Sequence, residues 1–474
     1  MSSLNVYKKT AAFFLTFCCV VLLLCGCSRN ASLQNKGEET FQIAFAYPLD
    51  GAANSVLERF QTEHADLNFE LVDYSEYNTP LDPTGGENKL CIDLVNGLCK
   101  PDLIIGEPES ELMIQVTGNH LFHDLSPYLA EGAKVRFEDL FASVRTSYST
   151  SAGEIWGICT AFTAETILGN NALIGNLCGK TEWTIDDLLD LADSLPADVY
   201  LMAGVTQETA SGLLLGKDMA EQFINREDMT CSFDDGRFVR WLRFLSALPK
   251  NYDQLLVSSP LDAATSAERY EFFHQNKVAL YGEEFWNMRF FTNMKAAFGT
   301  DDYTFLGYPS GQQNPVRLDL EQTYVIASSA EDPKLVWELI EAFFITDPDA
   351  LYRIHSIPVL KSMFEAIADD YAQYDFITYF SGSGGQVLHD DMIPFTEEDL
   401  EQPGIITRFT EQDRQRILNL FDNVNQPSLT ERMPENVRQI IDEEVSAFLN
   451  GNTEAERCAE IVQSRVSIWL AEHK

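Results

Sequence analysis

The chain has 474 residues, of which 45% are hydrophobic and 11% aromatic, a composition typical of globular proteins and unlike that of acidic disordered tails. Its 33 basic side chains are set against 73 acidic ones, so the formal net charge is −40. This charge argues against nucleic acid and anionic lipid headgroups as partners, because both require concentrated positive charge. A chain of this length usually divides into two lobes.

The first 26 residues have the pattern of a secretory signal. Lys8 and Lys9 precede an apolar run over residues 11–24, which is too short to remain as a membrane span. Residues 24–27 read Leu-Cys-Gly-Cys and resemble the lipobox of bacterial lipoproteins, although residue 25 is more often Ala or Ser. The resemblance implies cleavage after residue 26, a diacylglyceryl group on Cys27, and attachment to the outer face of the cytoplasmic membrane. Plain secretion and an uncleaved anchor are the alternatives.

After the signal, residues 27–40 hold the lipidated cysteine and a polar stretch without periodicity, which predicts a flexible tether. Six cysteines follow Cys27, scattered through a large chain, and we interpret them as buried free thiols in preference to disulfides. They are Cys91, Cys99, Cys159, Cys178, Cys231 and Cys458. The sequence has no CxxC pair, which excludes a zinc ribbon and a thioredoxin-like motif.

The next segment alternates between the period of a strand and that of a helix. The apolar positions predict strands over residues 41–47, 67–74 and 103–106, and helices over residues 53–64 and 88–96. Gly97 suits the end of the second helix. Such alternation predicts a parallel sheet covered by helices, in which ligands bind beyond the carboxyl ends of the strands. The loops at those ends are residues 47–50 and 107–110.

The C-terminal region predicts two amphipathic helices. Their apolar positions are Val437, Ile440, Ile441, Val445 and Phe448 in one, and Cys458, Ile461, Val462, Val466 and Trp469 in the other. Thr453 and Glu456 have the spacing of a capping box for the last helix. Residues 381–404 begin with Gly and Ser and become acidic, which indicates a loop insertion.

Several fragments, taken in order, resemble the extracellular solute-binding proteins of ABC importers, the family of the maltose-type sugar receptors. The fragments are residues 89–97, 101–104, 118–129, 153–162, 183–188, 276–286, 305–309, 324–327, 335–344 and 463–472. Each fragment alone is weak evidence for the family. Their order along nearly the whole mature chain is what makes the resemblance specific. One departure is Asn276, where the family usually has Gly.

The resemblance implies an α/β, two-lobe periplasmic-binding-protein-like fold of type II with a hinge of crossover strands. The first lobe would hold residues 41–157 and 304–348, and the second residues 158–303 and 349–474. Crossovers are expected near residues 157–162, 303–309 and 347–350. The expected function is capture of a sugar or oligosaccharide by a monomer, without a cofactor, and delivery to permease subunits served by a separate ATPase.

Sugar recognition needs aromatic faces that stack on pyranose rings, and carboxylates that bind hydroxyl groups. Candidate ligand-binding residues at strand ends and in the family's segments are Tyr47, Asp50, Glu107, Phe162, Glu284 and Trp286. Trp286 resembles the family's cleft tryptophan. Core packing is the alternative for Trp286 and Phe162, solvent exposure for Glu284, and helix capping for Glu107. The tryptophans in helical patterns, Trp183, Trp241, Trp337 and Trp469, are assigned to packing.

The sequence segments that come near to enzymatic motifs do not have the residue spacing that those motifs require. Residues 212–218 are one residue short of a phosphate-binding loop and end in Asp, where Ser or Thr must reach magnesium. His120, His123 and Asp124 lie too close together in one predicted loop to converge readily on a metal ion. We therefore expect no catalytic residues and no metal site. The alternatives are a lipid-anchored carbohydrate hydrolase, which requires a carboxylate pair, and a receptor domain that presents its ligand to a membrane sensor.

Overall fold

The structure is a computed structural model of residues 1–474. It describes residues 40–49, 51–130, 133–180, 182–214, 219–225, 228–285, 289–299, 302–311, 313, 316–344, 356–380, 386–388, 404–422, 429 and 435–473. The predicted signal, Cys27 and the tether up to residue 39 lie outside this part. So does the predicted third crossover at residues 347–350.

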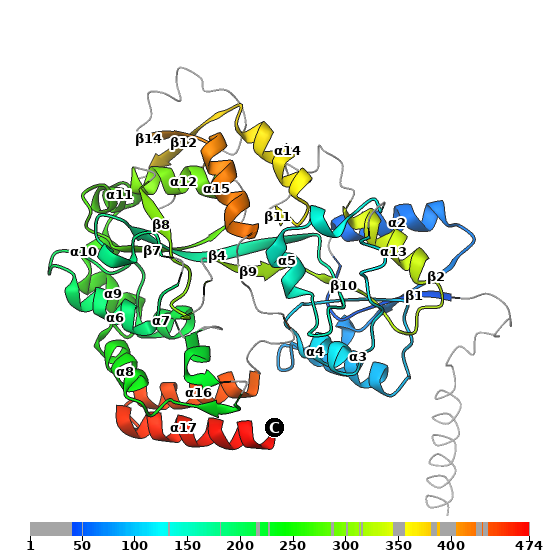
Figure 1. Ribbon diagram of the computed structural model, residues 1–474, viewed down its shortest axis with the longest axis horizontal. Coiled ribbons are helices and arrows are strands. Elements are labelled where there is room, and N and C mark those ends of the chain that lie inside the picture. The colour runs from blue at the N-terminus through cyan, green and yellow to red at the C-terminus, as the bar shows by residue number, and fades with distance from the viewer. Residues whose placement is uncertain are drawn as a thin grey trace, which may run out of the picture.

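A four-stranded sheet organises the first part of the chain, on the right in Figure 1. Its elements before the first crossover are β1 (Thr40–Phe45), α2 (Gly51–Glu63), β2 (Asn68–Asp73), η1 (Ser75–Tyr77), α3 (Gly85–Val95), β3 (Leu103–Gly106), α4 (Glu111–Gly118), η2 (Phe137–Asp139) and α5 (Ala142–Ser147). The strand order is β10-β3-β1-β2, and β1 runs parallel to β2 and to β3. This confirms the predicted parallel arrangement of the three strands and their connecting helices.

Helices cover both faces of this first sheet, with α2 beside α13 on one face and α3 beside α4 on the other (Figure 1). All four residues of β3 are buried, as expected of a central strand covered on both faces. The edge strand β2 is mostly exposed. Gly97 has φ of +65°, which only glycine adopts without strain, so it ends α3 as the sequence predicts.

A second sheet forms around the long strand β4, which extends leftward from the junction in Figure 1. The elements from β4 to the return of the chain are β4 (Ala161–Asn170), η3 (Gly175–Leu177), α6 (Ile185–Ser194), α7 (Gln207–Leu214), η4 (Met219–Phe223), β5 (Ile224–Asn225), β6 (Thr230–Cys231), α8 (Arg237–Ala247), α9 (Tyr252–Ser258), α10 (Pro260–Ala263), α11 (Ser266–His274), β7 (Leu280–Phe285), α12 (Arg289–Phe298), β8 (Tyr303–Phe305) and β9 (Arg317–Leu320). All partners of β4 are antiparallel to it: β9 and β8 lie along one edge, and β11 and β7 along the other.

The remaining elements return to both parts of the molecule. They are β10 (Thr323–Ile326), α13 (Pro333–Phe344), β11 (Ile357–Pro358), α14 (Lys361–Tyr371), β12 (Asp375–Phe380), β13 (Gln386–Leu388), β14 (Gly404–Arg408), α15 (Glu411–Asp422), α16 (Glu435–Leu449) and α17 (Ala455–Glu472). β13 lies inside the region expected to be a loop insertion, and it pairs with β12 in a three-stranded sheet completed by β14. The insertion therefore contains a strand, because its backbone extends an existing ribbon.

Within the described residues, two adjacent antiparallel segments connect the sheets. The outgoing segment pairs with the returning one at Ile158 and Tyr324, which exchange backbone hydrogen bonds of 3.1 and 2.8 Å, and again at Phe162 and Leu320. On this pairing, the first crossover comprises residues 158–162. The second lies at residues 320–324, and the expectation of residues 303–309 was wrong. There β8 still pairs with β4, and β9 follows in the same sheet before the chain leaves it.

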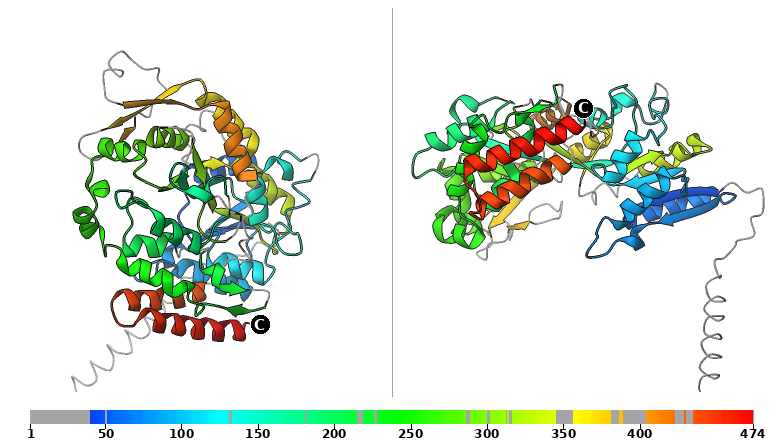
Figure 2. Two further views of the ribbon diagram at one scale, coloured as in Figure 1. Left: turned by 60° about the vertical axis from the view of Figure 1, so that its left-hand side comes forward. Right: turned by 90° about the horizontal axis from the view of Figure 1, so that it is seen from below.

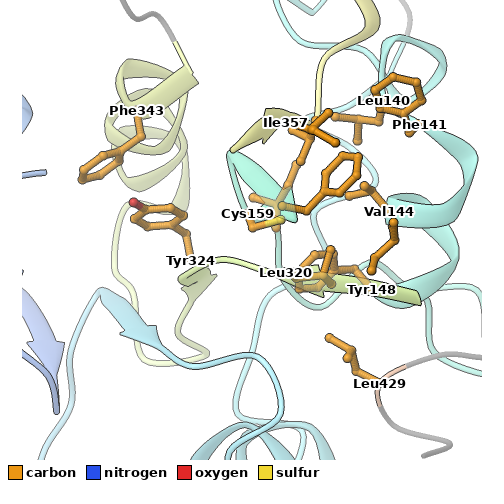
Figure 3. Close-up of a cluster of buried hydrophobic side chains, with 14 of the residues drawn as sticks. Leu140, Phe141, Val144, Tyr148, Cys159, Leu320, Tyr324, Phe343, Ile357 and Leu429 are labelled. Carbon is orange, nitrogen blue, oxygen red and sulfur yellow. The ribbon is translucent and has the colours of Figure 1, made fainter. Parts of the chain in front are cut away.

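Hydrophobic packing continues through this junction. Figure 3 shows Phe141, Leu320 and Ile357 meeting around the crossover, while Tyr324 stacks on Phe343 with ring centroids 4.5 Å apart. One buried cluster extends from the first sheet through this region to β7 and α12, and a second joins α6 and α8 to α16 and α17. The junction is thus a packed core element.

The two predicted C-terminal helices are present and lie side by side at the bottom of Figure 1. α16 and α17 bury the predicted stripe in large part, including Val437, Ile441, Val462 and Val466. The capping box predicted for the last helix does not form. The N-cap is Glu454, whose side chain makes no capping bond, and the Thr453 hydroxyl instead donates to the Glu454 carbonyl.

Most of the predicted packing tryptophans are buried: Trp183, Trp241 and Trp337 are at most 6% exposed. Trp469 is half-buried and stacks on His473. The six cysteines that follow Cys27 are all described and all free thiols. Among the helices of the described ranges, none has the length and apolar character needed to cross a membrane.

Candidate functional site

The candidate site lies where the parallel strands of the first sheet end and the crossover begins. β1 and β3 are neighbours, so the loops after Phe45 and Gly106 leave the same edge of the sheet. The helices α3 and α4 begin at this edge. Loops at the carboxyl ends of parallel strands are the usual ligand positions in such sheets. The pairing of β1 with β3 therefore makes the loops that follow them neighbours.

A buried glutamate stands at the centre of this edge. Glu87 belongs to the first turn of α3 and is 3% exposed. Burial raises the pKa of its carboxyl, and the charges of Glu107 and Glu111 raise it further, while hydrogen bonding with Ser110 and Tyr47 opposes the shift. Within the described part of the chain, Glu87 Oε1 has no hydrogen-bond partner. The site therefore holds a carboxyl oxygen whose bonding capacity is unused.

Asn78 fixes the position of that glutamate. Its Nδ2 donates to the Ala46 carbonyl at 2.8 Å, and its Oδ1 accepts from the Gly86 amide at 2.7 Å. This bridge joins the end of β1 to the start of α3. Gly86 is required there, because a Cβ atom would lie 2.4 Å from the Tyr74 carbonyl oxygen.

Tyr47 and Glu107, two of the predicted site residues, are both close enough to Glu87 to influence its carboxyl. Tyr47 is half-buried, and burial together with the charges of Glu87 and Glu107 raises its pKa to about 12, so it is a neutral hydroxyl at physiological pH. Glu107 remains exposed, yet the surrounding protein raises the pKa of its carboxyl, as do the charges of Asp319 and Glu321. Residues from the first loop, the third strand end and the return crossover thus converge.

Arg317, like Glu87, is a residue of this region that sequence reasoning missed. It lies in β9, is 7% exposed, and places its guanidinium 3.4 Å from Glu109 Oε1 and 3.4 Å from Glu165 Oε2. The Tyr308 hydroxyl also donates to Glu165 at 3.1 Å. The arginine thereby joins the loop after β3 to the central strand of the second sheet. Its only sequence signal is a basic residue inside the apolar strand 316–320.

Phe162 is a correction to the predicted set, because it packs in the core and does not border the site. It is fully buried, and its ring meets Phe421 and Phe141 edge to face at centroid distances of 5.1 and 5.9 Å. Successive side chains of a strand point to opposite faces of the sheet. In β4, Phe162 and Ala164 therefore point to the core, whereas Glu165 points to Arg317.

The other predicted residues fall on undescribed positions. Asp50 and Trp286 lie outside the described residues, and so does the side chain of Glu284. The backbone of Glu284 belongs to β7, directly opposite Glu165 of β4. Within the described ranges, no group of His, Cys, Asp or Glu side chains is arranged to hold a metal ion. In the His120–Asp124 segment, Asp124 instead accepts from Ser126 and from the Ile155 amide.

Comparison with solved structures identifies the architecture. The structure of the sugar-binding protein MalE from Xanthomonas citri aligns with 92% of this chain and 98% of its own, at a TM-score of 0.50 and 15% identity. The chain has the periplasmic-binding-protein fold. Extracellular solute-binding protein family 1 from Alicyclobacillus acidocaldarius aligns at a TM-score of 0.48 and 14% identity, covering 92% and 99% of the two chains. The substrate-binding protein Lmo0181 of Listeria monocytogenes, in complex with cycloalternan, aligns at a TM-score of 0.46 and 12% identity. The alignment covers 92% of this chain and 99% of that chain.

No protein-family model matches the chain, and no curated protein matches it in sequence. The relationship is therefore one of fold. Within the periplasmic-binding-protein fold of this chain, the edge bearing Tyr47, Glu87 and Glu107 is joined through Arg317 to the second sheet. Neutral hydroxyl, carboxylate and guanidinium groups at such an edge can form hydrogen bonds to a polar solute.

Proposed function

We propose that this chain is a lipid-anchored extracellular solute-binding protein that captures a sugar or oligosaccharide between two lobes and delivers it to an ABC importer. The observation that carries the proposal is that Tyr47 and Glu107 lie at adjacent strand ends of the first sheet, and Arg317 pairs with Glu109 of the same loop as Glu107, in a fold that aligns over 92% of the chain with a sugar-binding protein. Carboxylates accept hydrogen bonds from sugar hydroxyls, and Tyr47 offers both a hydroxyl and a ring face.

The two lobes would be built on the two sheets. In this proposal the first lobe holds residues 41–157 together with β10 and α13. The second lobe is built around β4 and includes the elements from β11 to α17. The boundary on the return path then lies at residues 321–322 and not near residue 304, in keeping with the pairing of β9. Because few segments cross between the sheets, a ligand that contacts both would favour a closed arrangement. Trp286, Asp50 and Glu284 stay predicted ligand contacts.

The proposals of a lipid anchor and of transport partners are based on the sequence. Lipidation of Cys27 would hold the protein at the outer face of the cytoplasmic membrane, since two or more acyl chains give stable attachment. Permease subunits and a separate ATPase are the proposed partners. A Cys27→Ser variant should appear in the culture medium or remain unprocessed, and mass spectrometry of the wild-type N-terminus should show a diacylglyceryl cysteine at residue 27.

The decisive test is a titration with neutral mono- and oligosaccharides, followed by tryptophan fluorescence and melting temperature, with an assay for released product in the same mixtures. A saturable shift without product supports a receptor. Trp286→Ala should weaken that binding, and Trp469→Phe, a helix tryptophan far along the chain, serves as its control. Product release would identify the alternative, a lipid-anchored carbohydrate hydrolase, and a receptor that serves a membrane sensor would bind equally well but fail to support uptake.

A further inference from the structure

Two carboxylates that belong to different sheets share one guanidinium group at the candidate site. Arg317 Nη1 lies 3.4 Å from Glu165 Oε2, and Arg317 Nη2 lies 3.4 Å from Glu109 Oε1. Because each carboxylate meets its own nitrogen, neither contact excludes the other. Glu165 is the register partner of Arg317 in the pairing of β4 with β9, whereas Glu109 follows β3 of the first sheet. The contact with Glu165 therefore lies within one sheet, and the contact with Glu109 bridges the two.

The second sheet holds the guanidinium of Arg317 in place. The arginine side chain is 8% exposed, so packing leaves it little freedom to turn toward solvent. Its partner Glu165 is fixed in turn by Tyr308, whose hydroxyl donates to the same Oε2 atom at 3.1 Å. β9, which carries Arg317, ends at Leu320, where the return crossover begins. The positive charge that Glu109 meets is thus preorganised by the second sheet, directly beside the connection between the two sheets.

The length of the Arg317–Glu109 contact indicates the direction in which it pulls. Hydrogen bonds from charged nitrogen donors to carboxylates are strongest at about 2.7–2.9 Å, so a contact of 3.4 Å gains strength when its two groups approach. Glu109 lies in the loop at the carboxyl edge of the first sheet, which is the edge of the candidate site. A rotation about the crossover that brings the second sheet toward this edge shortens the contact, and the opposite rotation breaks it. The attraction therefore favours the arrangement in which both sheets face the solute.

We propose that Glu109 and Arg317 are positioning residues that form a latch between the two lobes and set how tightly the solute is held. The latch acts on the equilibrium between open and closed arrangements and makes no contact with the solute. This inference rests on the proposed function, because it assigns the closure of the same site to a named ion pair. The apparent affinity of a protein falls with the population of its binding-competent state, so loss of the latch weakens binding without removing a ligand contact.

The first test is a double-mutant cycle on the full-length chain in detergent, with the neutral oligosaccharide that binds best in the panel above as the probe. Isothermal titration calorimetry should show that Glu109→Gln weakens binding roughly three- to tenfold. In an Arg317→Met background the same substitution should have little further effect, because its partner is gone. An equal effect in both backgrounds would mean that Glu109 contacts the solute itself, and tighter binding by Glu109→Gln would mean that the pair favours the open arrangement. Either result would overturn the latch.

Glu138→Gln is the matched control. Glu138 lies 3.0 Å from Arg136, so the substitution makes the same charge change and removes an ion pair that lies within the first lobe. It should leave the affinity unchanged. A loss of affinity equal to that of Glu109→Gln would show a general effect of charge and overturn the latch.

The second test needs no ligand. Dyes are attached through unnatural amino acids at Leu98, just after α3, and at Ile468 in α17, which are 75% and 56% exposed. Both helices lie below β4 in Figure 1, one in each lobe, so energy transfer between the dyes reports the opening. Glu109→Gln should lengthen the mean distance, and Glu138→Gln should not. An unchanged distance in Glu109→Gln would overturn the latch even where Arg317→Met fails to fold. Absence of binding by every sugar, together with the longer distance, would overturn the proposed function and leave the ion pair as a link between the lobes.

Discussion

Arg317 Nη2 lies 3.4 Å from Glu109 Oε1, so an ion pair joins a strand of the second sheet to a loop of the first across 208 positions of sequence. The same guanidinium reaches Glu165 in β4. The arginine side chain is 8% exposed, whereas the two carboxylates are about a third exposed. The contact therefore belongs to the junction between the sheets and not to the outer surface.

Replacing Arg317 by Met should destabilise the protein, because both carboxylates lose a charged partner near the core. Hydrogen bonds to charged groups contribute roughly 1.5–3 kcal/mol each, and at 3.4 Å we expect a loss of about 1–3 kcal/mol in the free energy of unfolding. Urea denaturation followed by circular dichroism measures it. Arg408→Met is the control, since Arg408 pairs with Asp375 on the surface and should change stability little. Equal effects of the two variants would contradict an interior role for Arg317.

Glu87→Gln should stabilise the protein increasingly as the pH rises from 4 to 7. The pKa of Glu87 is raised in the folded state above its unfolded value of about 4.3. The folded state therefore binds more protons over this range, and stability present at low pH is lost as the pH rises through the folded pKa. Gln does not titrate, so the variant escapes that loss. Thermal unfolding at several pH values measures the difference, and a constant difference between variant and wild type would refute it.

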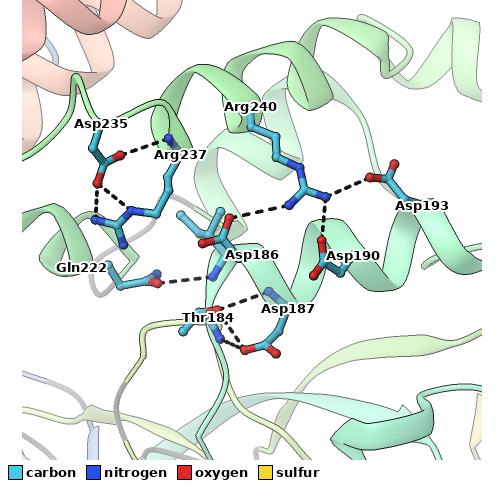
Figure 4. Close-up of polar contacts among 10 residues, drawn as sticks. Thr184, Asp186, Asp187, Asp190, Asp193, Gln222, Asp235, Arg237 and Arg240 are labelled. Carbon is cyan, nitrogen blue, oxygen red and sulfur yellow. Dashed lines mark hydrogen bonds and ion pairs between the residues drawn. The ribbon is translucent and has the colours of Figure 1, made fainter.

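Thr184→Ala should cost about 1 kcal/mol of stability. Thr184 caps α6: its hydroxyl accepts from the Asp187 amide at 3.2 Å, and the Asp187 carboxylate accepts from the Thr184 amide at 2.8 Å (Figure 4). Loss of such a cap usually costs 0.5–2 kcal/mol, roughly 1 on average. Chemical denaturation provides the measurement. Thr453→Ala is the matched control, because the capping box that the sequence predicts there is not formed, and it should be nearly neutral.

Asp413→Ala should be the most damaging of these substitutions. Asp413 Oδ2 lies 2.5 Å from Lys295 Nζ and accepts from the amide and hydroxyl of Thr410, and its side chain is 5% exposed. Removing one partner of a buried ion pair typically costs about 3–5 kcal/mol, since the other charge stays buried. Asp369→Ala, which removes an exposed partner of Arg414, should cost under about 1 kcal/mol. A similar shift of the urea midpoint in both variants would show that the Lys295 contact is not stabilising.

The arrangement of the molecule is seen from two further directions in Figure 2, where α16 and α17 lie side by side and pack against α8 in the second part. Their presence follows from sequence, because apolar residues recurring at helical spacing have no other stable arrangement. The same holds for β1, β2 and β3, whose alternating or continuous apolar runs indicate strands. The position of the loop residues Tyr47 and Glu107 follows as well, since parallel strands end at one edge.

The sequence by itself determined the order of the early elements, the two C-terminal helices and the chemistry available at the strand ends, because these depend on residues close together in the chain. The tertiary structure decided what Phe162, Arg317 and Glu87 do. Strand periodicity sets which residues share a face but not which face is inside, so Phe162 became core and Arg317 became the link between the sheets. The second crossover lies at residues 320–324 and not at the predicted residues 303–309, because β9 still pairs with β4 in the second sheet. The two strands are some 150 positions apart in the sequence, so no local pattern of residues could predict their pairing.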